Sequence, residues 1–214
     1  MAHKLLLILL SVALLNISNA QNNWVLKADK DGIKVYTGTM PDSKVKAIKV
    51  VSTLHTTLNQ LAVAILDVNT AKQWVYSTKS CVLLKQVSPT ELFYYSEVNV
   101  PWPVSNRDFV AHLTLHQDAV TKVMTVDAEN APTYLPAKAN VVRIPQSIGK
   151  WVATPMGNND VKIEYTLFAD PGGSVPSWLI NMFITKGPLE SFKNLKGLLN
   201  NQTFNDTQVA FVKN

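Results

Sequence analysis

Residues 170–181 read Asp-Pro-Gly-Gly-Ser-Val-Pro-Ser-Trp-Leu-Ile-Asn, and an apolar pattern continues from there to about Asn200. The two glycines end any preceding strand, because glycine adopts backbone angles that other residues avoid. Ser174 can cap a helix, and Pro176 suits a first helical turn, where its missing N–H is no loss. The stretch therefore predicts that a strand ends here and that a C-terminal helix begins.

The predicted helix has one apolar face. Its apolar side chains recur at helical spacing: Trp178, Leu179, Met182 and Phe183 come first, and Leu189, Phe192, Leu195 and Leu199 extend the stripe. Gly187-Pro188 lies inside the run and predicts a kink or an interruption. The apolar face either closes a filled core or lines a cavity, and the pattern alone leaves both interpretations open.

Most of the chain before this helix has the pattern of β-strands. The strand patterns cover residues 33–37, 44–52, 81–86, 92–98, 109–117, 121–128, 139–144, 150–153 and 161–169. Short connections between consecutive strands predict an antiparallel meander. Residues 24–28 predict a short leading helix, Thr57 and Gln60 a capping box that starts a second helix, and residues 67–74 a third.

The predicted layout is α+β, with a curved antiparallel sheet of about nine strands around one long C-terminal helix. That helix is the only segment long enough to cover the apolar face of the sheet, so a tunnel can remain between the two. At 214 residues with 47% hydrophobic content, the chain fits a single domain with a sizeable core.

The first twenty residues have the pattern of a signal peptide. Lys4 gives a basic start, residues 5–15 are apolar, and small residues at 18–20 offer a cleavage site. We therefore expect a signal peptide at 1–20 and one mature domain at 21–214, exported to a Gram-negative periplasm or secreted. The mature chain keeps 19 basic and 15 acidic residues, a mild net charge of +4. Cys81 is the only cysteine, so no internal disulfide can form.

The sequence offers little catalytic or metal-binding chemistry. It lacks a Gly-x-Ser-x-Gly elbow, a phosphate-binding loop, a dinucleotide fingerprint and paired cysteines. His112 and His116 lie in an alternating strand, which separates them by roughly 13 Å and predicts side chains that face solvent. Glu97, Asp108 and Glu164 are isolated acids with no partner acid or base at short spacing. We therefore predict no catalytic residue, no metal site and no cofactor.

Residues 101–110 read Pro-Trp-Pro-Val-Ser-Asn-Arg-Asp-Phe-Val, two prolines followed by adjacent opposite charges. Strand alternation puts Arg107 on the apolar side with Phe109, where a guanidinium must be paired or hydrogen-bonded. Arg107 either ties the proline corner to neighbouring strand ends or contacts a polar group of a ligand.

The segments 101–110 and 170–181 closely resemble signature segments of StAR-related lipid-transfer (START) domains. Supporting matches are Asp-Gly-Ile-Lys-Val-Tyr at 31–36, Lys-Gln-Trp at 72–74 and Val-Val-Arg-Ile at 141–144, and the resemblance spans 24–200 in order. It implies the helix-grip fold, in which a curved sheet wraps a C-terminal helix and leaves a tunnel for one lipid. It also implies that this helix and the adjoining loops open as a lid.

The motifs are most similar to those of the phosphatidylcholine-transfer subgroup, but its polar-head site is not carried over. The resemblance places the subgroup's phosphate-binding arginine on Ala71 and its choline-caging aromatics on Ser96, Phe109 and about Ser147. Without the arginine, and with at most one of the aromatics, a phosphate clamp and a cation–π cage cannot form. We expect a less polar ligand, such as a sterol-like, hopanoid, fatty-acyl or isoprenoid molecule.

The favoured interpretation is a monomeric, non-catalytic module that shields one hydrophobic ligand or lipid from water, with transfer of that ligand as an extension of the role. The predicted lining residues are Trp178, Leu179, Met182 and Phe183 on the helix, and Tyr94, Ser96, Val98, Arg107, Phe109, Ala111 and Leu113 on the sheet. Transient contact with a membrane surface is expected, and nucleic-acid binding is not. Two alternatives stay open: a tunnel enzyme of cyclase or hydrolase type, and a cell-envelope interaction protein with a filled core.

Overall fold

The computed structural model describes residues 24–39, 46–201, 204 and 209–214, so the predicted signal peptide at 1–20 lies outside the described residues. The strands are β1 (Val25–Lys30), β2 (Ile33–Thr39), β3 (Lys46–His55), β4 (Thr78–Ser88), β5 (Glu91–Val98), β6 (Asn106–Gln117), β7 (Met124–Asn130), β8 (Val141–Arg143), β9 (Gln146–Gly157) and β10 (Asp160–Asp170). The helices are α1 (Leu58–Leu66), α2 (Ala71–Trp74), α3 (Ser177–Asn181), the π-helical η1 (Met182–Lys186) and α4 (Gly187–Asn200).

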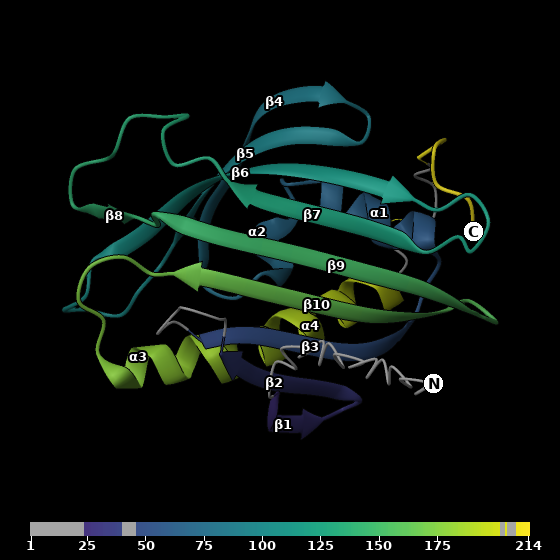
Figure 1. Cartoon of the computed structure of the whole chain (residues 1–214), viewed down its shortest axis with the longest axis horizontal. Helices are drawn as coiled ribbons and strands as arrows, with labels where there is room; N and C mark the ends of the chain where they lie inside the picture. The colour runs from purple at the N-terminus through teal and green to yellow at the C-terminus, as the bar shows by residue number, and fades with distance from the viewer. Residues whose placement is uncertain (1–23, 40–45, 202–203, 205–208) are drawn as a thin grey trace, which may run out of the picture.

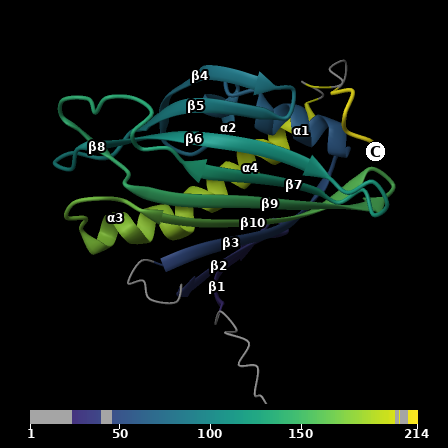
Figure 2. The ribbon, with the colours of Figure 1, turned by 45° about the horizontal axis from the view of Figure 1, so that its top comes forward.

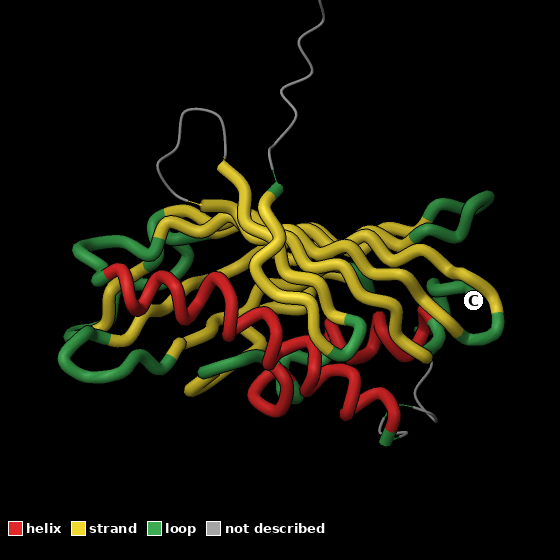
Figure 3. The backbone as a smooth tube through the Cα atoms, turned by 90° about the horizontal axis from the view of Figure 1, so that it is seen from below, coloured by secondary structure: helices red, strands yellow, loops and turns green. Residues whose placement is uncertain are grey.

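Within the described part of the chain, these ten strands form one sheet (Figure 1). Nine run antiparallel in the order β1-β2-β3-β10-β9-β7-β6-β5-β4, and β8 pairs in parallel with β6. The helices lie on one face of the curved sheet (Figures 2 and 3). There α4 contacts β2, β3, α1 and α2. The predicted α+β helix-grip layout, a curved sheet around a C-terminal helix, is confirmed.

The start of α1 is fixed by its own side chains, as the sequence predicts. The Gln60 backbone N–H donates to Thr57 Oγ1 over 3.2 Å, and the Thr57 N–H donates to Gln60 Oε1 over 3.1 Å. These two bonds satisfy donors that a helix N-terminus otherwise leaves unpaired. Most of the helix is buried in the core.

The C-terminal helical run is continuous from α3 through η1 to α4, although Gly187-Pro188 predicts a kink or an interruption. Pro188 has no N–H, and its ring crowds the carbonyl oxygen four residues earlier, on Ile184. The preceding turn widens to π geometry, in which the Gly187 N–H donates to the Met182 carbonyl oxygen. The proline is therefore accommodated by a wider turn, and the helix continues.

Three local predictions are wrong. Residues 24–28 do not form a helix, because Asp31 and Gly32 take φ angles of 54° and 78°, values suited to a tight hairpin turn that pairs β1 with β2. Ser174 does not cap α3, whose N-cap is Pro176. The strand predicted from residue 121 begins at Met124, since Thr121 is bonded to Asp118 in the turn before it.

No helix among the described residues is both long enough and apolar enough to cross a membrane.

Candidate ligand-binding site

Strand register brings the predicted residues of β5 and β6 onto one face of the sheet. The cross-strand pairs are Tyr94–Ala111, Ser96–Phe109, Val98–Arg107 and Leu92–Leu113. Directly paired residues of antiparallel strands point to the same side. Leu92 and Leu113 belong to the core beneath the helices, so all the predicted sheet residues lie on the concave face.

This concave face is packed at one end and incompletely covered at the other. At the packed end, side chains with no exposed surface come from both layers: Val50, Val126, Ala153, Ile163 and Leu195. At the other end, Ser96, Arg107 and Ala111 are buried, but five inward-facing side chains are only half-buried: Tyr94, Val98, Phe109, Tyr165 and Leu167. We call these five residues the open half. Protein interiors are normally close-packed, so accessible surface on this inner face marks space that the chain does not fill.

The helical elements α3 and η1 lie on the same side of the sheet as the open half (Figures 2 and 3). The segment 171–176 leads from the end of β10 directly into α3, which lies beside that end of the sheet (Figure 1). Leu179 is buried, Met182 and Phe183 are half-buried, and Trp178 is 49% exposed. Phe183 packs edge-on against Tyr76, with ring centroids 6.0 Å apart. Three of the four predicted helix residues are thus at least half-buried, and Trp178 projects largely into solvent.

Polar groups in the open half are few and uncharged. Burial raises the pKa of the Tyr94 phenol, with smaller contributions from Cys81 and Tyr165, and burial raises the pKa of Tyr165. Burial also raises the pKa of the Cys81 thiol to about 11, so this thiol stays protonated and unreactive at neutral pH. Ser96 donates to the Ser80 carbonyl oxygen over 3.3 Å.

Arg107 is buried at the end of the concave face and bonds only to backbone among the described residues. Its Nη1 donates to the Ser105 carbonyl oxygen (2.6 Å), Nε to that of Pro171 (3.3 Å) and Nη2 to that of Gly172 (3.3 Å). Gly172 has a φ of +67°, and a Cβ there would meet the Arg143 carbonyl oxygen at 3.2 Å, so a side chain would strain and crowd this turn. The guanidinium thus joins the proline corner to the turn before α3.

We expect Arg107→Leu to lower the free energy of unfolding by about 2–4 kcal/mol, because three carbonyl groups lose the charged donor that joins the proline corner to the turn before α3. Thermal or urea unfolding of ligand-free protein measures the loss. A variant that melts like the wild type but no longer holds ligand would assign Arg107 to the binding site instead.

The acidic residues that were considered as possible catalysts lie on the convex face of the sheet, opposite the open half. Glu97 pairs in register with Asp108 and bonds to Lys79 and Asn106, and these two bonds lower the pKa of Glu97 to about 2. Asp108 accepts two hydrogen bonds from Arg143, of 2.7 and 3.1 Å. Glu164 pairs with Lys162 at 2.8 Å on the exposed side of β10. None of these carboxylates points into the open half.

The histidines are placed outward as well. His112 stacks on Phe93 on the convex face and lies 2.7 Å from Glu91, and His116 is exposed. Across the described residues, no cluster of three or more His, Cys, Asp or Glu side chains could hold a metal ion.

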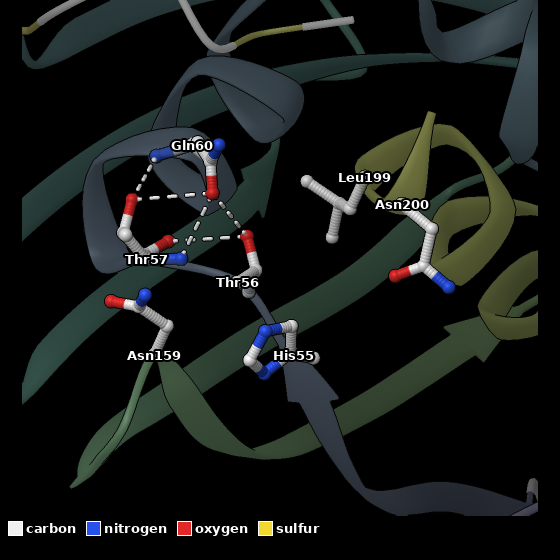
Figure 4. A pocket seen from close by; sticks show the side chains of 7 residues that line it. All are labelled: His55, Thr56, Thr57, Gln60, Asn159, Leu199 and Asn200. Carbon is white, nitrogen blue, oxygen red and sulfur yellow. Dashed lines mark hydrogen bonds between the residues drawn. The ribbon is translucent and has the colours of Figure 1, made fainter. Parts of the chain in front are cut away.

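A separate pocket of about 540 Å³ lies where α1 meets the end of α4 (Figure 4). Its lining residues are His55, Thr56, Thr57, Gln60, Asn159, Leu199 and Asn200. The side chains of Thr56, Thr57 and Gln60 bond to one another, and His55 bonds to Asp160. Six of its seven lining residues have polar side chains, and none of the seven belongs to the predicted site.

Sequence reasoning named Phe192 on the helix stripe but missed the sheet aromatics Trp151 and Tyr165, which mark the boundary of the open half. The Trp151 ring lies 4.5 Å from Tyr165 and stacks on Phe192 of α4 at 5.3 Å. Trp74 meets Trp151 edge-on, and its Nε1 is buried without a hydrogen-bond partner among the described residues. Strand alternation within 161–169 indicates that Tyr165 points to the same side as the apolar residues of that strand. The residues that Tyr165 contacts on other strands depend on the strand order, which the alternation does not show.

Comparisons with known proteins agree with this architecture. A family model described as START domain matches residues 7–204. An uncharacterised protein of Pseudomonas aeruginosa is 34% identical over 175 residues, 81% of this chain and 85% of the relative. Phosphatidylcholine transfer protein of Mus musculus is 28% identical over 178 residues, 81% of this chain and 82% of the relative.

Among solved structures, a STAR-related lipid transfer protein fragment from Xanthomonas axonopodis is 34% identical, with a TM-score of 0.75. The match covers 83% of this chain and 98% of that one. The extent of these matches, over a curved sheet and helix of the same kind, leads to one conclusion: the chain belongs to the START domain family.

Proposed function

We propose that the protein binds one hydrophobic ligand, without catalysis, between the open half of the sheet and the wall formed by α3 and η1. One observation carries the proposal: the inward-facing side chains of Tyr94, Phe109 and Leu167 keep accessible surface at one end of a concave face whose other end is packed. Apolar surface left in contact with water is unfavourable. Binding of a ligand that covers this surface is therefore favoured by the burial of apolar surface on both the ligand and the protein.

The size of this gain fits reversible binding. Covering roughly 400 Å² of apolar ligand surface contributes on the order of 10 kcal/mol before costs are subtracted. Association and ordering take back a large part of that figure. A net affinity in the micromolar range or tighter follows, which is adequate for holding a lipid and for transferring it between membranes.

Two alternatives have weaker support. A tunnel enzyme needs an acid and a base beside the ligand, whereas Glu97, Asp108 and His112 lie on the convex face. An interaction protein with a filled core needs the inner face to be packed throughout, whereas the burial of β10 side chains falls from Ile163 to Tyr165 and Leu167.

Solvent extraction of the protein purified from its native host, followed by mass spectrometry of the extract, tests the proposal. We expect one unmodified hydrophobic molecule for each chain. Recovery of a substrate together with its transformed product would favour the enzyme, and an extract without any stoichiometric molecule would favour the filled core.

The end of the molecule near α3 is the proposed site of transient membrane contact. Arg107 joins the corner that carries Trp102 to the turn before α3, so Trp102, Trp178 and Ile180 gather at one end. Trp102 is 91% exposed there, and tryptophan favours the membrane interface. We propose that a ligand leaves or enters the open half at the same end.

We expect Trp102→Ser to reduce binding to lipid vesicles several-fold while leaving the melting temperature unchanged, because the indole makes little contact with the fold. Val120→Ser is the matched control, since Val120 is 88% exposed in the turn at the other end of β6. Vesicle co-sedimentation measures both. Equal loss of binding in the two variants would contradict this orientation on the membrane.

We also propose that residues 1–20 are removed as a signal peptide and that the domain 21–214 acts in a periplasm or outside the cell. The support is the basic start, the apolar run and the small residues at 18–20. Intact-mass analysis of protein from the native host is expected to show a chain that starts at Gln21. A chain in the cytoplasm that retains its first twenty residues would contradict the proposal.

A further inference from the structure

Two phenol groups inside the open half have no partner. Neither Tyr94 nor Tyr165 forms a side-chain hydrogen bond with any residue that the structure describes, although Tyr95, next along β5, bonds to Glu97 on the convex face. Both Tyr94 and Tyr165 keep some accessible surface on the concave side. Neither hydroxyl is fully enclosed by protein, because the only side-chain N or O atoms buried without a partner among the described residues are Trp74 Nε1 and Asn130 Oδ1. Polar groups that line a cavity normally bond to protein, water or ligand, so both hydroxyls are available to a bound molecule.

The two phenols project from the same concave face of the sheet. Tyr94 extends from β5, where it packs edge-on against Phe109 with centroids 5.8 Å apart. Tyr165 extends from β10, and its ring passes 3.8 Å from the position that a Cβ on Gly149 of β9 would occupy. The Tyr165 ring therefore leans over β9, toward the strands that carry Tyr94. The two groups are also close enough for Tyr165 to contribute to the raised pKa of Tyr94.

No charge is available to neutralise a charged ligand at this position. Among the described residues, the buried charged side chains are Glu97, Arg107 and Asp108, and the two acids are on the convex face. Arg107 donates to three backbone carbonyl groups. It lies four residues along β6 from Ala111, the partner of Tyr94, which is roughly 13 Å away. A phosphate or carboxylate beside the phenols would be buried without a counter-ion, at high cost.

We propose that the Tyr94 and Tyr165 hydroxyls are the polar anchor of the site, and that the ligand is a lipid whose only polar group beside them is an uncharged hydroxyl or carbonyl. This inference rests on the proposed function, because it specifies one end of the ligand that the open half would hold. Apolar contacts supply the affinity, and the anchor fixes which end of the lipid enters first and excludes lipids with a charged head.

Three pyrene-labelled probes with the same flexible chain test the anchor: the decanol, the decane and the decanoate. Energy transfer from the protein's tryptophans to pyrene measures the dissociation constant of each probe. The variants are Tyr94→Phe, Tyr165→Phe and the double variant, which remove hydroxyls without removing rings. Tyr36→Phe is the matched control, because Tyr36 lies on the convex side of β2 beside Lys49.

We expect each single variant to bind pyrene-decanol about 3- to 10-fold more weakly, the usual effect of one lost hydrogen bond. Binding of pyrene-decane is expected to stay unchanged in all variants, and Tyr36→Phe is expected to match the wild type with every probe. This comparison isolates the hydroxyl contribution from the hydrophobic one.

The outcomes separate the anchor from the proposed function. If the wild type binds the decanol and the decane, but the variants weaken both probes equally or neither probe, the anchor is wrong and the proposed function stands. Tighter binding of the decanoate than of the decanol by the wild type would overturn the uncharged-head assignment. If the wild type takes up none of the probes, the proposed function fails and the anchor fails with it.

Discussion

Phe183→Asp is expected to fold and to lose its ligand. Phe183 is half-buried on η1, and its recorded ring contact is the edge-on one with Tyr76. Without ligand, a carboxylate there can remain hydrated, so we expect the free energy of unfolding to fall by only about 1–2 kcal/mol. With ligand, the same carboxylate would be buried against hydrocarbon, and binding is expected to weaken by about 100-fold or more.

Phe192→Asp is the matched control on the same helical stripe. Phe192 is 1% exposed and stacks on Trp151, so its replacement puts an unpaired charge into the packed end. We expect a loss of more than about 4–5 kcal/mol, enough to unfold a marginally stable domain. Thermal melting without ligand and titration with a fluorescent lipid measure both variants. If Phe183→Asp unfolds as Phe192→Asp does, the helix face closes a filled core, and if it folds and still binds, Phe183 is not in the site.

Asp108→Ala is expected to lower the free energy of unfolding by about 3–5 kcal/mol, because it leaves a largely buried guanidinium without its charge partner. Asp108 is fully buried, and the side chain of its partner Arg143 is only 12% exposed. Arg143 also donates to the carbonyl oxygens of Pro132, Leu135 and Pro136. The pair thus fastens the segment between β7 and β8 to β6, and its loss is expected to release that segment.

Lys162→Ala is the control for the Asp108 variant, because Lys162 and Glu164 form an ion pair with both side chains more than 40% exposed. Exposed pairs contribute about 0–1 kcal/mol. Urea unfolding of the two variants beside the wild type gives both differences. Equal and small losses would mean that the Asp108–Arg143 pair is not a structural clamp, and the possibility that Asp108 acts in chemistry would have to be reconsidered.

Local patterns were sufficient for the parts of the fold that depend on neighbours in sequence. Alternation assigned Phe109, Ala111 and Leu113 to the inner face of β6, because side-chain parity along a strand is a local property. The capping box of α1 was predicted for the same reason. The leading strand β1 was missed because residues 25–30 pair with β2 only through the hairpin at Asp31, and their own composition gives no clear alternation.

The candidate site depends on contacts between residues that are far apart in the sequence. Tyr165 was recognisable as an inward position, but its contact with Trp151 and its place over Gly149 require that β10 lie next to β9. The parallel pairing of β8 with β6, which brings Arg143 to Asp108, is likewise a long-range contact. The sequence shows the same apolar pattern along the packed end and the open half of the concave face. The difference between the two arises only when the helices and the sheet are assembled.

Native mass spectrometry of the protein purified from its host, without detergent or organic solvent, is the most direct test of ligand binding in the open half. We predict one dominant species, heavier than the mature polypeptide by the mass of one small lipid, that falls to the polypeptide mass when the protein is denatured. A species at the polypeptide mass alone, unchanged after incubation with lipid vesicles, would contradict this account.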